Sequence, residues 1–139
     1  MLSPKMSMII LLLLTSCSRI DSNISVEGVY QSVSESEWDL TVSLFSGGKA
    51  QIKLEKWDAG KYEKRDVKIV AGSWSMDNNN IVLRYEDITD ILHYTDNLPL
   101  NELGLEGGAP GLMQVPPIER KSIIHGIKLW KEPHKFYSK

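Results

Sequence analysis

The sequence predicts an all-β domain, folded as a small antiparallel meander barrel of about seven or eight strands. From Val26 onward, apolar and polar residues alternate in several short runs, which is typical of strands with one buried face. Clusters of Gly, Asn, Asp and Ser separate these runs at roughly the 8- to 12-residue spacing of sandwiches and barrels. No run after residue 25 has a convincing helical period. A length of 139 residues fits one domain with one core.

The first half of this domain begins with a predicted hairpin. A first strand opens at residues 28–30. Residues 38–44 then alternate, the Ser-Gly-Gly-Lys sequence at 46–49 supplies a turn, and residues 50–55 alternate again. Two alternating runs joined by a short glycine-containing turn are typical of a β-hairpin.

The same pattern continues through the middle of the chain. After a turn at residues 58–61, residues 67–74 are expected to form a strand with apolar residues in both phases. The Asp-Asn-Asn-Asn sequence at 77–80 predicts a tight turn, because Asn and Asp tolerate positive φ. Residues 81–86 alternate and form the strand that follows.

The last third is less regular. Residues 88–94 are expected to form a strand, and residues 123–130 the final one, with Ile123, His125, Ile127 and Leu129 on one side. Between them, residues 97–121 are rich in Gly and Pro, which opposes regular strand pairing. The apolar residues of 98–121 leave two alternatives open: a lid over the barrel mouth, or a contact surface for a partner.

The N-terminus is predicted to be a targeting segment. Lys5 provides a positive charge, residues 8–14 are apolar, and Thr15 and Ser16 are the small residues that a signal peptidase requires. The apolar run is shorter than the roughly 18 residues of a membrane-spanning helix. Met6 is an alternative start, which would remove Lys5 from the segment.

The sequence Leu14-Thr15-Ser16-Cys17 resembles the lipobox of bacterial lipoproteins. The resemblance implies a signal peptide at 1–16, cleavage before Cys17, and palmitate-like acyl chains on this residue, the lipid attachment site. Two or more buried acyl chains hold a protein firmly on a membrane. Ser18 in place of Asp implies an outer-membrane address facing the periplasm. The alternative is an ordinary secretory signal with a buried cysteine.

The remaining chain then divides into three parts. Residues 17–25 form the lipidated N-terminus and a polar tether, residues 26–131 the β-barrel domain, and residues 132–139 a C-terminal tail. A flexible linker of this length spans about 15 Å. The domain is therefore expected to lie close to the membrane surface.

Four short segments carry a resemblance to a known fold. They are Gly28-Val29-Tyr30, "LTVSLFSGGKAQI", "GKYEKRDVKIVAGSWSMDNNNIVLRY" and "IKLWK". These segments resemble the small lipocalin-like barrel of bacterial lipoproteins, most closely the N-terminal domain of NlpE-type copper-resistance lipoproteins. That family has a CxxC pair after its first strand, and here the corresponding residues 32–39 are "SVSESEWD". Because thiolates are the ligands that select Cu(I), the resemblance implies the barrel but no copper or thiol-redox role.

Composition and motifs argue against several functional classes. A formal net charge of −2 gives no electrostatic case for nucleic acid. One cysteine excludes an intramolecular disulfide, and His93, His125 and His134 lack metal-ligand spacing, so no metal or other cofactor is expected. The sequence at 46–49 matches S-x-x-K, but it lies in a predicted hairpin and not on a helix. We therefore expect no enzyme activity.

The aromatic residues leave one question open. Trp38, Trp74 and Trp130 lie on predicted strands, where they fill a small core or line a ligand pocket. The function we expect is that of a lipid-anchored, non-catalytic binding or interaction module of the cell envelope. Two alternatives are an envelope stress or surface-sensing adaptor that contacts another envelope protein, and a carrier of a small hydrophobic ligand.

Overall fold

The structure is a computed structural model, and it describes residues 26–32, 38–57 and 65–132. The predicted signal peptide, Cys17 and the tether lie outside the described residues, as does the C-terminal tail beyond residue 132. Residues 33–37 and the predicted turn at 58–61 also lie outside this part of the chain.

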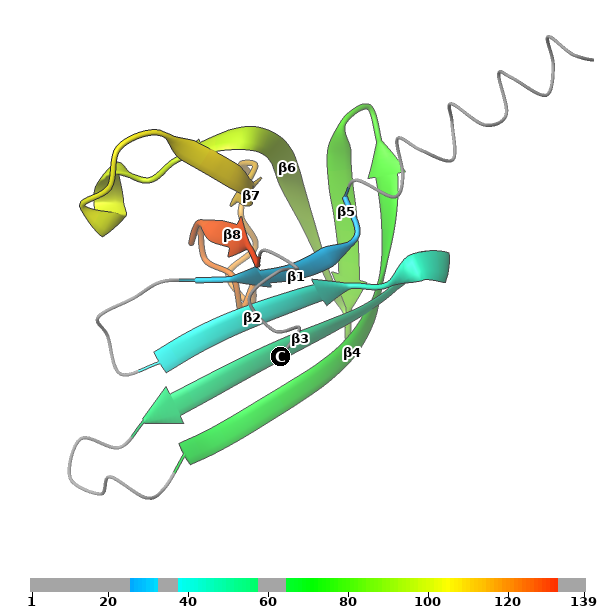
Figure 1. The fold of residues 1–139 in the computed structure, drawn as a ribbon. Helices are drawn as coiled ribbons and strands as arrows, with labels where there is room; N and C mark the ends of the chain where they lie inside the picture. The colour runs from blue at the N-terminus through cyan, green and yellow to red at the C-terminus, as the bar shows by residue number, and fades with distance from the viewer. Residues whose placement is uncertain (1–25, 33–37, 58–64, 133–139) are drawn as a thin grey trace, which may run out of the picture.

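The described chain forms a closed antiparallel barrel in which strands that follow one another in sequence are neighbours (Figure 1). Pairing between the first and last strands closes it, so the predicted all-β meander barrel is confirmed. The eight strands are β1 (Gly28–Gln31), β2 (Trp38–Leu44), β3 (Lys49–Trp57), β4 (Arg65–Asp77), β5 (Asn80–Tyr85), β6 (Ile88–Pro99), β7 (Gly108–Gln114) and β8 (Leu129–Lys131). The helical elements in the described residues are two short 3-10 turns, η1 (Ser46–Gly48) and η2 (Asn101–Leu103).

The predicted first half of the domain is confirmed in its elements. Val42 pairs with Ile52 across β2 and β3, and both side chains point into the barrel. Asn78 and Asn79 have φ of 48° and 70° in the turn between β4 and β5, the conformation that a tight hairpin turn requires. Gly72 lies where a Cβ atom would be 2.5 Å from the carbonyl oxygen of Arg84, so only glycine lets β4 and β5 approach this closely.

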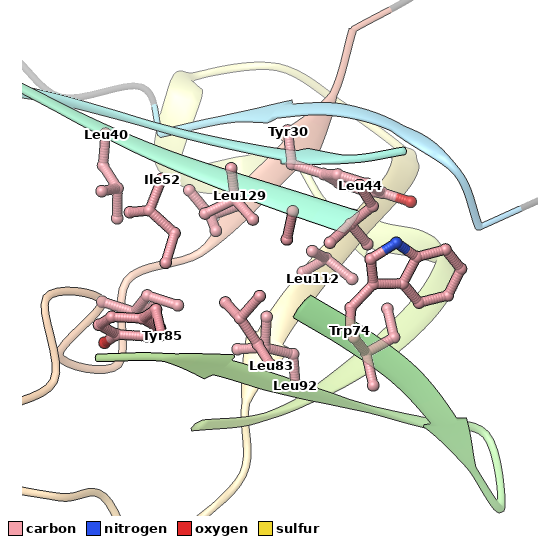
Figure 2. Close-up of a cluster of buried hydrophobic side chains, with 14 of the residues drawn as sticks. Tyr30, Leu40, Leu44, Ile52, Trp74, Leu83, Tyr85, Leu92, Leu112 and Leu129 are labelled. Carbon is pink, nitrogen blue, oxygen red and sulfur yellow. The ribbon is translucent and has the colours of Figure 1, made fainter. Parts of the chain in front are cut away.

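Buried side chains fill the barrel axis (Figure 2). Tyr85 and Trp74 lie toward opposite ends of this row of side chains. The indole of Trp74 is 9% exposed, and its Nε1 donates a hydrogen bond of 2.8 Å to the carbonyl of Phe45. Trp130 is also buried, whereas Trp38 is only partly buried against the core. The core interpretation therefore holds for Trp74. Trp130 is buried but lies outside the core cluster, and its Nε1 donates a hydrogen bond to the carbonyl of Leu98.

The prediction that residues 97–121 stay outside the sheet is wrong, because β7 lies within them and pairs with β6 and β8. Gly111 and Pro110 would disfavour a strand in isolation, but both fit the packing of β7. A Cβ atom on Gly111 would meet a side-chain carbon of Leu98 at 2.5 Å and the carbonyl oxygen of Leu129 at 2.6 Å. Pro110 lies beside the register shift between Thr95 and Leu98, where a missing N–H is tolerated.

The predicted final strand at 123–130 is also wrong over most of its length. Regular pairing is limited to β8, which begins at Leu129. His125 and Gly126 have φ of 49° and 74°, a left-handed conformation that ends any strand alternation. The isoleucines of this region instead belong to an irregular segment, residues 122–127, in which Ile124 is fully buried.

Candidate functional site

The two ends of the barrel differ. At one end, β2, β3 and β4 continue beyond β5, because β4 pairs with β3 from Arg65 onward but with β5 only from Gly72 onward. We call this the open end; it carries Trp38 and Leu54 on the inner face of the sheet. We call the opposite end, which carries Trp74, the closed end.

The irregular 122–127 segment lies at the open end, and side chains from the barrel hold it there. Asp90, on β6, is 2% exposed and points inward between Ile88 and Leu92. Its carboxylate accepts hydrogen bonds from Tyr85 Oη at 2.6 Å, Ser122 Oγ at 2.8 Å and Gln114 Nε2 at 2.9 Å. A buried carboxylate is tolerated when hydrogen bonds of this kind satisfy it.

The same side chains also bind the backbone of the segment. Tyr85 Oη accepts from the Ile123 N–H at 2.9 Å, and Ser122 Oγ accepts from the Ile124 N–H at 3.1 Å. Gln114 Oε1 accepts from the Gly126 N–H. Among the described residues, no buried side-chain nitrogen or oxygen lacks a partner. This network fixes the segment without strand pairing.

The Tyr85 hydroxyl remains a donor over the physiological pH range. Burial, and then its hydrogen bond to Asp90, raise the pKa of the Tyr85 phenol to about 12. The Ser122 hydroxyl donates a hydrogen bond to the Asp90 carboxylate and is itself buried. The geometry thus gives Asp90, Ser122 and Gln114 a structural role.

Between the 122–127 segment and the extended sheet lies an open cleft of about 350 Å³. Its walls are mainly apolar, and Ser122 of the network forms part of its lining. The lining residues are Trp38, Leu54, Lys56, Ser122, Ile123, His125 and Ile127.

The cleft combines an apolar wall with two basic side chains. Trp38, Leu54 and Ile127 are partly buried, so apolar surface remains for a ligand to cover. Lys56 and His125 are exposed, and both contribute to the lining. The arrangement suits an apolar group with a polar or acidic neighbour, bound at the surface and not enclosed.

The sequence singled out part of this cleft and missed the rest. Trp38 was a candidate for core or pocket, whereas His125 was expected on the final strand and was judged to lack metal-ligand spacing. Asp90 and Gln114 were missed, because the sequence at 88–92 does not alternate and only the burial pattern of β6 in the structure shows that Asp90 points inward. Ser122 has no such signal, because its neighbours form no regular element.

The other candidate residues lie apart from the cleft or outside the described chain. His93 is exposed on β6, and its Nδ1 lies 3.2 Å from Asn80 Oδ1. Within residues 26–32, 38–57 and 65–132, no group of three or more His, Cys, Asp or Glu could hold a metal ion. His134 and Cys17 lie outside these ranges. In the same ranges, no helix is both long and apolar enough to cross a membrane.

Comparisons with protein-family models, curated proteins and solved structures found no match to this chain. The geometry of the barrel and the sequence motifs therefore carry the functional argument.

Proposed function

We propose that the protein is a lipid-anchored, non-catalytic interaction module of the cell envelope, and that the cleft at the open end is its binding surface. The Leu-Thr-Ser-Cys motif at 14–17 behind an apolar run supports the lipid anchor at Cys17. The partly buried apolar lining of the cleft supports the binding surface, and this observation carries the proposal.

The position of the chain's entry into the barrel fits this arrangement. β1 begins at Gly28, opposite Leu44, and Glu27 lines a hollow of about 430 Å³ together with Trp74 and Met76. The described chain therefore begins at the closed end. The seven residues of β2 separate the two ends by roughly 20 Å. With the anchor at Cys17, the cleft is on the side of the barrel farther from the attachment point.

The outer-membrane, periplasm-facing location is part of the proposal and comes from Ser18 in the lipobox context. The resemblance to lipocalin-like, NlpE-type lipoproteins is also part of the proposal, and a closed antiparallel barrel is the fold that this resemblance implies. An adaptor role, in which the cleft contacts a membrane sensor or adhesin, is one form of the proposed interaction.

A carrier of a small hydrophobic ligand is the second candidate. The filled barrel axis speaks against a ligand inside the barrel, because Leu83, Leu92 and Leu112 occupy the centre and are fully buried. A small ligand would be restricted to the cleft, which is open to solvent. An open cleft suits an apolar segment of a partner protein better than a cargo that needs shielding from water.

The test uses the full-length protein in its native membrane. A photo-reactive amino acid at Lys56, on the cleft rim, should crosslink one envelope protein, and the same probe at the exposed Thr89 of β6 should not. Titration with a fluorescent fatty acid separates the second candidate, since saturable binding with quenched tryptophan fluorescence would indicate a carrier. If both positions give the same products and the fatty acid does not bind, the cleft is not a binding surface.

A further inference from the structure

Although the barrel is closed, β4 has an open edge. Its residues 72–77 pair with β5, whereas residues 66–71 pair with β3 on one side only. In the described part of the chain, no strand pairs with the other side of residues 66–71, and Figure 1 shows this stretch at the border of the sheet. An edge of this length offers backbone N–H and C=O groups to an added strand.

The outer face of this edge is apolar and exposed. The side chains of Val67 and Ile69 are 49% and 58% exposed, the latter among the most exposed large apolar side chains of the described residues. They are next-but-one neighbours on one strand and point to the same side of the sheet. An edge strand with exposed β-branched residues is a surface that a second strand would cover.

The inner face of the edge carries charges of opposite sign at Asp66 and Lys68. Charged residues often protect an edge from other chains. The two charges are opposite in sign and lie two residues apart, so this stretch of β4 can face a second copy of itself with unlike charges opposed. When two copies pair antiparallel about Val67, Asp66 of each copy lies opposite Lys68 of the other, twice in one interface.

The present partners of these charges leave room for such pairing. Lys68 Nζ lies 3.8 Å from a Glu86 carboxylate oxygen in an exposed ion pair, which contributes little by itself. Asp66 pairs in register with Lys56 of β3. In the two-copy arrangement, Asp66 would lie between Lys56 of its own sheet and Lys68 of the second copy.

We propose that the protein forms a homodimer by antiparallel pairing of residues 65–69 of β4 with the same residues of a second copy, in a register centred on Val67. The register centred on Lys68 would put two lysines opposite each other, and like charges in that position destabilise a sheet. The register centred on Ile69 would place Asp66 against Gly72, which already pairs with β5. The two strands are then related by two-fold symmetry, which is the commonest symmetry of homodimers. This dimer does not depend on the cleft or on the lipid anchor.

Disulfide trapping tests the dimer and its register in the full-length protein. In the proposed register, Val67 of one copy lies opposite Val67 of the other, and their Cα atoms are about 4.5–5.5 Å apart, within the range of a disulfide. Mild oxidation should therefore convert most of a Val67→Cys variant to covalent dimer. In the matched control, Ile69→Cys, the cysteine lies opposite residue 65 of the other copy, so the variant should still associate but should form no disulfide-linked dimer. The unmodified chain shows the background from Cys17.

Charge exchange gives an independent readout of the same contact. Asp66→Lys or Lys68→Asp alone should weaken dimerisation at least tenfold, measured by sedimentation in detergent, and the double exchange should restore it. Both residues are exposed, so the variants should fold. A monomer at all concentrations, a crosslink in Ile69→Cys in place of Val67→Cys, or no rescue by the double exchange would overturn the proposal.

Discussion

Replacing the buried Asp90 tests whether side chains, and not strand pairing, hold the open end together. The Asp90→Ala variant removes an acceptor that three groups share: Tyr85 Oη, Ser122 Oγ and Gln114 Nε2. Leaving a buried donor unsatisfied costs about 1–3 kcal/mol each, and Gln114 keeps its second contact with Ser122. We therefore expect a loss of about 3–5 kcal/mol, a large part of the roughly 5–15 kcal/mol of a typical domain.

The assay is urea unfolding of the full-length protein in detergent, followed by tryptophan fluorescence. Asp90→Asn keeps the volume and one acceptor oxygen, so its loss should be smaller, about 1–2 kcal/mol. The control is Thr89→Ala, on the exposed side of the same strand. Amide exchange at residues 123–126 should increase in Asp90→Ala. A loss below about 1 kcal/mol, or an equal loss in Thr89→Ala, would refute the structural role of the network.

The pKa of Tyr85 is about 12 in the folded protein and about 10 in the unfolded chain, so the free energy of unfolding should fall as pH rises from about 10 to 12. This fall should be less steep in Tyr85→Phe, and an equal slope would contradict the expectation. Cys17→Ser should release the protein from the membrane fraction or leave it uncleaved, and mature-sized protein in that fraction would exclude the anchor. Trp74→Ala should cost about 3–5 kcal/mol by urea unfolding, since the indole is buried; less than about 1 kcal/mol would place it outside the core. Replacing residues 104–117 with a Gly/Ser linker removes β7, so the melting temperature should drop sharply; unchanged stability would argue against β7 as part of the barrel.

Strands β2, β3 and β5 could be predicted because each follows a local rule. Residues 38–57 alternate, and their turn has glycines, so period and turn chemistry agree. The two asparagines at 78–79 specify a tight turn without help from the rest of the chain. In these elements the sequence determines side-chain direction locally, and the barrel interior follows from it.

The last third could not be predicted because tertiary contacts override the local signals there. Gly111 weakens a strand in isolation, yet its missing Cβ is what Leu98 and the Leu129 carbonyl require. Ile123 and Ile127 alternate like strand residues, but the intervening left-handed His125 and Gly126 place them along the cleft. For the same reason, the cleft itself could not be located from the sequence.

The closing strand of the barrel is also its shortest, and this sets the order in which the fold loosens. β8 has three residues, and its register with β1 and with β7 comprises two residue pairs on each side. Every other seam has at least four. Amide protons of β8 should exchange with solvent before those of β2 to β5, because fewer bonds must open at once. Such an opening turns the closed cylinder into a curved sheet with two new borders, β1 and β7. Unfolding is thus expected to begin at β8, which is remote in sequence from the hairpin of β2 and β3.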